Sequence, residues 1–240
     1  MLEVKELTKK YSKKTAVDGL SFSVGDNEIV GLLGPNGAGK TTTMNMITGF
    51  TAPTSGSVEI DGTDMAKDPI AAKAKLGYLP EQPPVYPEMT VREYLRFVAE
   101  LKGVKKSRVD AAAKEASVSS VINRRIGNLS KGYIQRAGLA AALLGDAKVI
   151  ILDEPTVGLD PNQLIEMRNL IKRLGKTHTV ILSSHILSEI SEVCGRVIIM
   201  NEGKIAADVA VDKNDKELEK LFVRLTGKEE GTEDDSDTKA

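Results

Sequence analysis

The hydrophobic pattern along the chain predicts strands near both ends and helices in the middle. Apolar and polar residues alternate over 2–7 and 20–24, which is typical of strands with one exposed face. The apolar run within 28–33 predicts a buried strand that leads into a loop, and the run at 149–152 predicts another apolar strand. Further short runs predict strands at 57–61, 75–79, 179–182, 196–200 and 204–209. The last two flank Asn201-Glu202-Gly203, which predicts a hairpin turn with glycine at a positive φ.

Helices are predicted between these strands and across most of 83–144. Thr90 and Glu93 have the spacing of a helix-start signal in which the threonine caps the first turn. Apolar or alanine-rich positions then favour helices around 94–101, 111–113 and 137–142, and other helices are expected at 41–50, 161–174 and 186–193. Strand–helix alternation on both sides of a helical block indicates an α/β fold with an inserted helical subdomain.

Composition narrows the class of protein. The 240 residues carry 33 basic and 34 acidic side chains, so the near-neutral chain is not expected to bind nucleic acid in bulk. No apolar run approaches the ~18 residues of a membrane span, and the N-terminus lacks a secretory signal. Cys194 is the one cysteine, expected as a small buried side chain. We therefore expect a soluble, intracellular protein.

The C-terminal end differs from the rest of the chain. Apolar residues at 218, 221, 222 and 225 have helical spacing and predict a short helix within 212–226. Residues 227–240 contain two basic and six acidic side chains and no apolar residue except Ala240. Such a segment has nothing to bury, so we expect a disordered acidic tail, with an interaction tail as the alternative.

A glycine-rich loop after the predicted strand at 28–33 matches a phosphate-binding motif. The sequence from Gly34 to Thr41 is GPNGAGKT, which fits G-x-x-x-x-G-K-[ST] between a strand and a helix. Glycines let the backbone N–H groups turn toward phosphate oxygens, and Lys40 supplies a charge for the β- and γ-phosphates. Thr41 offers a hydroxyl to Mg²⁺, which Thr42 supports. The predicted ATP contacts are Asn36, Gly37, Ala38, Gly39, Lys40, Thr41 and Thr42.

Two carboxylates end the apolar strand at 149–152. In a phosphate-loop ATPase, the first of them, Asp153, holds Mg²⁺ through water. The second, Glu154, is placed to polarise the attacking water as a general base. The pair is a weak signal by itself and gains its meaning from the phosphate loop.

The segment Leu129-Ser130-Lys131-Gly132-Tyr133 resembles the L-S-G-G-Q signature of the ATP-binding-cassette (ABC) ATPases. The order of phosphate loop, signature and acidic strand is specific to that superfamily, and the resemblance covers about 2–211. It implies three further roles by position. Tyr11 resembles the aromatic residue on which adenine stacks, Asp160 the dimer-contact residue of the D-loop, and His185 the switch histidine that reaches the γ-phosphate. His178 fits no motif and is expected at the surface.

The sequence departs from the family pattern at two motifs. The signature has Lys131 and Tyr133 where glycine and glutamine are usual, while Ser130 and Gly132, the pair implied to contact the γ-phosphate, remain. In the Q-loop, either Glu81 or Gln82 is a candidate to reach Mg²⁺ or the attacking water. Both departures are similar to exporters of the ABC-2 type, especially the cassettes named after gliding motility.

The resemblance implies a RecA-like core of the phosphate-loop NTPases, with an antiparallel β subdomain and an inserted helical subdomain. The expected division is a core of 1–82 and 144–211, a helical subdomain of 83–143, a helix within 212–226 and the tail. Two cassettes, identical or related, are expected to bind ATP and Mg²⁺ head to tail beneath a separate integral-membrane permease, at the cytoplasmic face of the membrane. The expected docking cleft contains Pro83, Pro84, Val85, Tyr86, Pro87 and Met89, unless this is a connector packed on itself. A soluble ABC ATPase without a permease is the alternative function.

Overall fold

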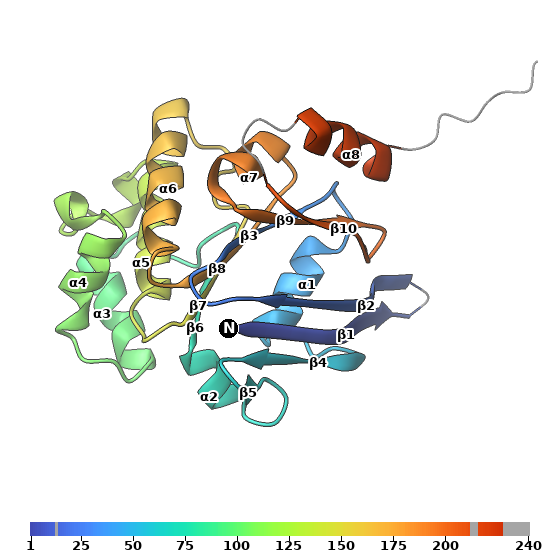
Figure 1. Ribbon diagram of the computed structural model, residues 1–240. Coiled ribbons are helices and arrows are strands. Elements are labelled where there is room, and N and C mark those ends of the chain that lie inside the picture. The colour runs from blue at the N-terminus through green and yellow to red at the C-terminus, as the bar shows by residue number, and fades with distance from the viewer. Residues whose placement is uncertain (13, 212–215, 228–240) are drawn as a thin grey trace, which may run out of the picture.

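The computed structural model describes residues 1–12, 14–211 and 216–227, and it contains two β-sheets and a layer of helices (Figure 1). The smaller sheet is antiparallel with strand order β2-β1-β4-β5. Its strands are β1 (Leu2–Tyr11), β2 (Lys14–Val24), β4 (Ser55–Ile60) and β5 (Thr63–Asp64). The first two strands are longer than their alternating patterns predict, because irregular register after Val4 lets them continue pairing to Tyr11 and Lys14.

The larger sheet has six strands in the order β10-β9-β3-β8-β7-β6. They are β3 (Ile29–Leu33), β6 (Leu76–Leu79), β7 (Val149–Asp153), β8 (Thr179–Ser184), β9 (Arg196–Asn201) and β10 (Lys204–Ala210). All neighbours are parallel except the β9–β10 hairpin. Glu202 and Gly203 turn this hairpin at φ values of 47° and 80°, which confirms the predicted turn.

The six-stranded sheet is covered on both faces. Val149 and Ile151 of β7 belong to the hydrophobic cluster shared with α1 (Lys40–Ile47) and the antiparallel sheet. Ile150 and Leu152 of the same strand belong to the other cluster, which the helical layer completes. Because successive strand residues point to opposite faces, a strand covered on both sides reads as a continuous apolar run. The predicted fold class, with both additional subdomains, is confirmed.

Seven α-helices follow α1 in the described part of the chain, and all but α2 lie where the sequence pattern predicts a helix. They are α2 (Pro69–Ala74), α3 (Val91–Leu101), α4 (Arg108–Glu115), α5 (Lys131–Ala142), α6 (Pro161–Leu174), α7 (Leu187–Val193) and α8 (Lys216–Thr226). Thr90 and Glu93 form the full capping box at the start of α3. The elements α2 and β5 were not predicted, since six and two residues are too short to show a period. The helix predicted at 41–50 ends at Ile47, before Gly49 with a φ of 65°.

The C-terminal prediction is confirmed only in part. The helix α8 begins at Lys216 and packs against the larger cluster through Leu218, Leu221, Phe222 and Leu225. Residues 212–215 and the predicted acidic tail from 228 onward lie outside the described residues. Within the described ranges, no helix has both the length and the apolar character that crossing a membrane requires.

The parallel strands bring the predicted motifs to one edge of the sheet. The strands β3, β6, β7 and β8 are parallel, so their carboxyl ends meet at the same edge. The phosphate loop follows β3, Glu81 follows β6, Glu154 follows β7 and His185 follows β8. Ligands of open α/β sheets bind at this edge. The topology therefore places four separate motifs around one position.

Candidate active site

The phosphate loop holds a buried ammonium group. Gly39 caps α1 with a φ of 103°, and a Cβ there would lie 2.7 Å from the carbonyl oxygen of Ala16, so only glycine fits. Lys40 Nζ donates hydrogen bonds to the carbonyl oxygens of Gly34 at 2.7 Å and Pro35 at 3.2 Å. Burial lowers the pKa of Lys40, and the nearby carboxylates oppose this shift. An anion in the loop would offset the cost of burying this charge.

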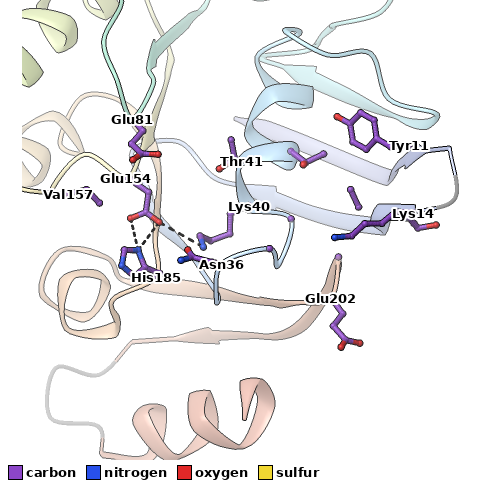
Figure 2. A pocket seen from close by; sticks show the side chains of 16 residues that line it. Tyr11, Lys14, Asn36, Lys40, Thr41, Glu81, Glu154, Val157, His185 and Glu202 are labelled. Atoms are coloured by element: carbon purple, nitrogen blue, oxygen red, sulfur yellow. Dashed lines mark hydrogen bonds and ion pairs between the residues drawn. The ribbon is translucent and has the colours of Figure 1, made fainter. Parts of the chain in front are cut away.

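The loop opens into a cavity of about 870 Å³. Figure 2 shows Tyr11 and Lys14 on one side of it, Glu154 and His185 on the other, and Lys40 between them. The predicted residues that line it are Tyr11, Asn36, Gly37, Gly39, Lys40, Thr41, Thr42, Glu81, Glu154 and His185. Ala38 belongs to the loop but is buried beneath it. The Tyr11 ring is half exposed, so a face remains open for stacking.

Glu154 and His185 form the polar pair at the end of the cavity. His185 Nδ1 lies 3.1 Å from both carboxylate oxygens of Glu154. Lys40 Nζ lies 3.9 Å from Glu154 Oε1, with both side chains buried. Glu154 has a φ of 47°, a left-handed conformation that a residue with a Cβ rarely adopts, and its N–H donates to Ser183 Oγ at 2.9 Å. Strain of this kind at a cavity is typical of active sites.

Asp153 lies beneath the pair and is almost fully buried. Burial raises its pKa, which the hydrogen bond from Ser183 Oγ at 2.6 Å opposes and the charge of Glu81 adds to. Thr41 is close enough for its hydroxyl to stabilise the Asp153 carboxylate. A hydroxyl and a carboxylate are oxygen donors, and Mg²⁺ in phosphate-transfer sites uses few protein oxygens together with phosphate oxygens and water. The donor set therefore fits Mg²⁺.

The two Q-loop candidates lie in different places. Glu81 lines the nucleotide-sized cavity and is directed into it, as Figure 2 shows. Gln82 lines a second cavity of about 590 Å³. The backbone carbonyl of Glu81 accepts a hydrogen bond from Gln135 Nε2 of α5 at 2.8 Å. The geometry brings Glu81 to the cavity and leaves Gln82 outside it.

The signature residues lie outside the chain's own cavity. Ser130 is exposed at the start of α5, and Gly132 N–H donates to Gln163 Oε1 at 3.1 Å. Asp160 caps α6, accepting a hydrogen bond from Gln163 N–H at 2.9 Å. Neither Ser130, Gly132 nor Asp160 is among the described residues that line the phosphate-loop cavity. One chain therefore presents its signature away from its own phosphate loop.

The sequence did not predict several cavity residues. Lys14, Thr15 and Ala16 come from β2, and Glu202 and Gly203 come from the β9–β10 turn. A Cβ at Gly203 would lie 2.8 Å from the carbonyl oxygen of Ala16, so the two segments are in close contact. No spacing in the sequence indicates this contact, because it depends on how the two sheets meet.

A second cavity contains some of the residues expected in the docking cleft. Pro83, Pro84 and Tyr86 line it, whereas Val85 and Met89 pack against the helical core and Pro87 is not among the described residues that line it. Phe97 and Leu101 of α3 line it as well, with the Phe97 ring edge-on to Tyr86 at 5.6 Å between centroids. Leu101 is 71% exposed and Phe50, across the cavity, is 80% exposed. Apolar positions on the solvent side of α3 were the signal for this surface.

Cys194 and His178 are two further side chains that could carry chemistry. Cys194 is buried as predicted, and burial raises the pKa of its thiol. His178 is partly buried rather than exposed, since its Nδ1 lies 3.2 Å from the carbonyl oxygen of Leu174 at the end of α6. It is not among the residues that line the phosphate-loop cavity.

Comparison with known proteins agrees with this geometry. Residues 17–157 match the family model described as ABC transporter. The chain belongs to the ABC transporter family. This cassette is 39% identical over 226 residues to the bacitracin transport ATP-binding protein BcrA of Bacillus licheniformis, covering 91% of this chain and 74% of the relative. It is 38% identical over 217 residues to the Nod factor export ATP-binding protein I of Paraburkholderia xenovorans (strain LB400), covering 87% and 70%.

A solved structure extends the comparison to the whole fold. The dimeric structure of a post-hydrolysis state of the ATP-binding cassette MJ0796 bound to ADP and Pi has a TM-score of 0.79 and 25% identity, covering 88% of this chain and 99% of that one. The identification from the sequence is confirmed: this cassette is the ATP-binding subunit of an ABC transporter, an ATPase that drives transport.

Proposed function

We propose that this cassette hydrolyses ATP as one half of a head-to-tail dimer that drives export through a separate membrane permease. The observation that carries the proposal is the separation of two half-sites on one chain. The cavity holds the phosphate loop, Glu154 and His185, while Ser130 and Gly132 begin a helix outside it. A second cassette, turned head to tail, would bring its own signature to this cavity and complete the site.

Each cavity residue has a defined task in the proposed reaction. Tyr11 stacks on the adenine, and Lys40 neutralises the β- and γ-phosphates. Glu154 accepts the proton of the attacking water, with His185 holding its carboxylate at 3.1 Å. Thr41 and Asp153, with Glu81 nearby, would hold Mg²⁺, which supplies charge stabilisation at the phosphates. Loss of the γ-phosphate then removes the contacts to the partner's signature, and the dimer opens.

The second cavity is the proposed docking site for one helix of the permease. Its apolar lining joins Gln82 and Pro83, next to the nucleotide cavity, with α3 and α5. We propose that 83–143 moves as a helical subdomain against a core of 1–82 and 144–211, which would carry motion from nucleotide to permease. The cassette would then lie at the cytoplasmic face of the membrane. The export named for one relative and the antibiotic transport named for another support the exporter assignment.

The test is purification of the Glu154→Gln cassette from its native membranes with ATP and Mg²⁺. The variant retains the shape of the site but lacks the base, so it is expected to bind ATP, close and retain its partners. A multi-span membrane protein should copurify in detergent. Adding Lys40→Ala to this variant should abolish the capture, because the phosphates lose their charge partner.

Capture of ribosomes or nucleic acid, or of no membrane protein, would overturn the permease assignment in favour of a cassette that works without one. Hydrolysis by the Glu154→Gln cassette at the wild-type rate would instead overturn the catalytic role of Glu154.

A further inference from the structure

A buried carboxyl group lies behind the catalytic pair, outside the residues that the motifs point to. Glu189 of α7 is 5% exposed, and its Oε2 accepts hydrogen bonds from Thr156 Oγ1 at 2.5 Å and Ser184 Oγ at 3.1 Å. Among the described residues, no lysine or arginine forms an ion pair with it. Burying a carboxyl group with only hydroxyl partners is costly unless the bonds are well made.

The two hydroxyl groups belong to the two segments that carry the catalytic pair. Thr156 follows Glu154 by two residues on the loop after β7. Ser184 directly precedes His185 at the end of β8, and its Oγ also accepts a hydrogen bond from Ile186 N–H at 3.0 Å. One oxygen of Glu189 therefore accepts a hydrogen bond from each of the two loops. The Ser184 hydroxyl also accepts a hydrogen bond from Ile186 N–H, so it connects the residues before and after His185.

The contact between the two side chains depends on the paths of the two loops that carry them. Glu154 adopts a strained φ of 47°. The His185 side chain is 41% exposed, so its direction depends on the backbone path through Ser184 and Ile186. A small displacement of either loop would open the 3.1 Å contact between ring and carboxylate. A displacement of about 1 Å in an active site can lower the reaction rate about 100-fold.

We propose that Glu189 is a positioning residue for ATP hydrolysis: its buried oxygen ties Thr156 to Ser184 and so sets the contact between His185 and Glu154. The proposal rests on the roles proposed for those two residues. It assigns to Glu189 no contact with the nucleotide.

The test measures the environment of the His185 ring. The chain has two histidines, so the imidazole resonances of His185 are observed by NMR in the full chain without nucleotide, with His178 as internal reference. Thr156→Val and Glu189→Met remove the donor and the acceptor with little change in volume, and both should shift the His185 resonances. Thr156→Ser and Glu189→Gln keep a hydroxyl and an oxygen at these points and should leave them in place.

The kinetic expectation follows from the same geometry. Thr156→Val and Glu189→Met should lower kcat for phosphate release about 10-fold or more and leave KM for ATP within about twofold, because Tyr11 and the phosphate loop, which are proposed to bind the nucleotide, keep their positions. Thr179→Val is the matched control. It removes a different buried hydroxyl, at the start of β8, which donates to the Gly25 carbonyl at 2.8 Å. This variant should leave kcat and the His185 resonances unchanged.

Unmoved His185 resonances in Thr156→Val and Glu189→Met would overturn the proposal, as would an equal shift in Thr179→Val. These outcomes are distinct from failure of the proposed function. A Glu154→Gln cassette that hydrolyses ATP normally would remove the catalytic role of Glu154, yet the resonance positions would still report whether Glu189 sets the loop.

Discussion

Glu81 and Gln82 are adjacent in the sequence, yet they line two different cavities, Glu81 the one with the phosphate loop and Gln82 the apolar one beside α3. The two residues form a bend soon after β6, so one peptide unit borders both cavities. A hydrogen bond from Gln135 Nε2 to the Glu81 carbonyl holds the backbone at this bend.

The first prediction separates the two residues by function. Glu81→Ala should lower ATP turnover about 10–100-fold, the range for residues that support a metal site. Gln82→Ala should leave turnover of the purified cassette within about twofold. Phosphate release with saturating Mg²⁺ measures both, and equal losses in the two variants would contradict the assignment.

The charge of Glu81 near Asp153 also predicts how ATP turnover depends on pH. Burial raises the pKa of Asp153 and the charge of Glu81 raises it further, and Asp153 must be ionised to hold Mg²⁺. Turnover should therefore fall as the pH drops through the raised pKa of Asp153. Glu81→Gln removes the repulsion and lowers that pKa, so the acidic limb should move to lower pH. A pH–rate profile of kcat measures this, and a limb that moves upward would contradict the sign.

Tyr11 is expected to carry part of the affinity for the base. A stacked aromatic contributes about 1–3 kcal/mol per base, so Tyr11→Ala should weaken ATP binding about 5–100-fold. Tyr11→Phe keeps the ring and should bind as the wild type does. Calorimetric titration with ATP gives both values. Equal affinity for all three proteins would mean that the half-exposed ring is a surface residue without contact to adenine.

The backbone at Glu154 predicts an unusual order of stabilities. At a left-handed φ, alanine costs about 1–2 kcal/mol relative to glycine, so Glu154→Gly should be more stable than Glu154→Ala by about that amount. At Arg96, exposed in the middle of α3, the order should reverse, with alanine about 1 kcal/mol better. Urea unfolding measures the four variants. If alanine were more stable than glycine at both positions, the backbone at Glu154 would not be strained.

Gly132 tests the proposed dimer without touching the cassette's own nucleotide cavity. A Cβ at this position would lie 2.6 Å from Gln163 Oε1, so Gly132→Ala should displace that side chain from the start of α5. ATP binding by the single cassette should be unchanged, while the ATP-dependent dimer of the Glu154→Gln protein should be lost. Gly145→Ala, with its nearest contact at an ordinary 3.7 Å, is the control. Size-exclusion chromatography with light scattering distinguishes the outcomes.

The local features of this protein were determined by its sequence. The phosphate loop, the capping box at Thr90 and the start of α6 at Pro161 each depend on residues within about one helical turn. The apolar run of β7 likewise predicts a strand, and the carboxylates at its end follow from chain order. These interactions join residues that are close in the sequence, so the spacing of residue types predicts them.

Only the tertiary structure decided which distant segments share a site. It placed Glu81 rather than Gln82 at the nucleotide cavity, brought Lys14 and Glu202 to its rim, and set Glu189 behind Glu154 and His185. None of these contacts has a sequence period, because each depends on strand order and on packing between layers. Parallel strands bring residues far apart in the chain to one edge, and burial then selects which side chain points inward.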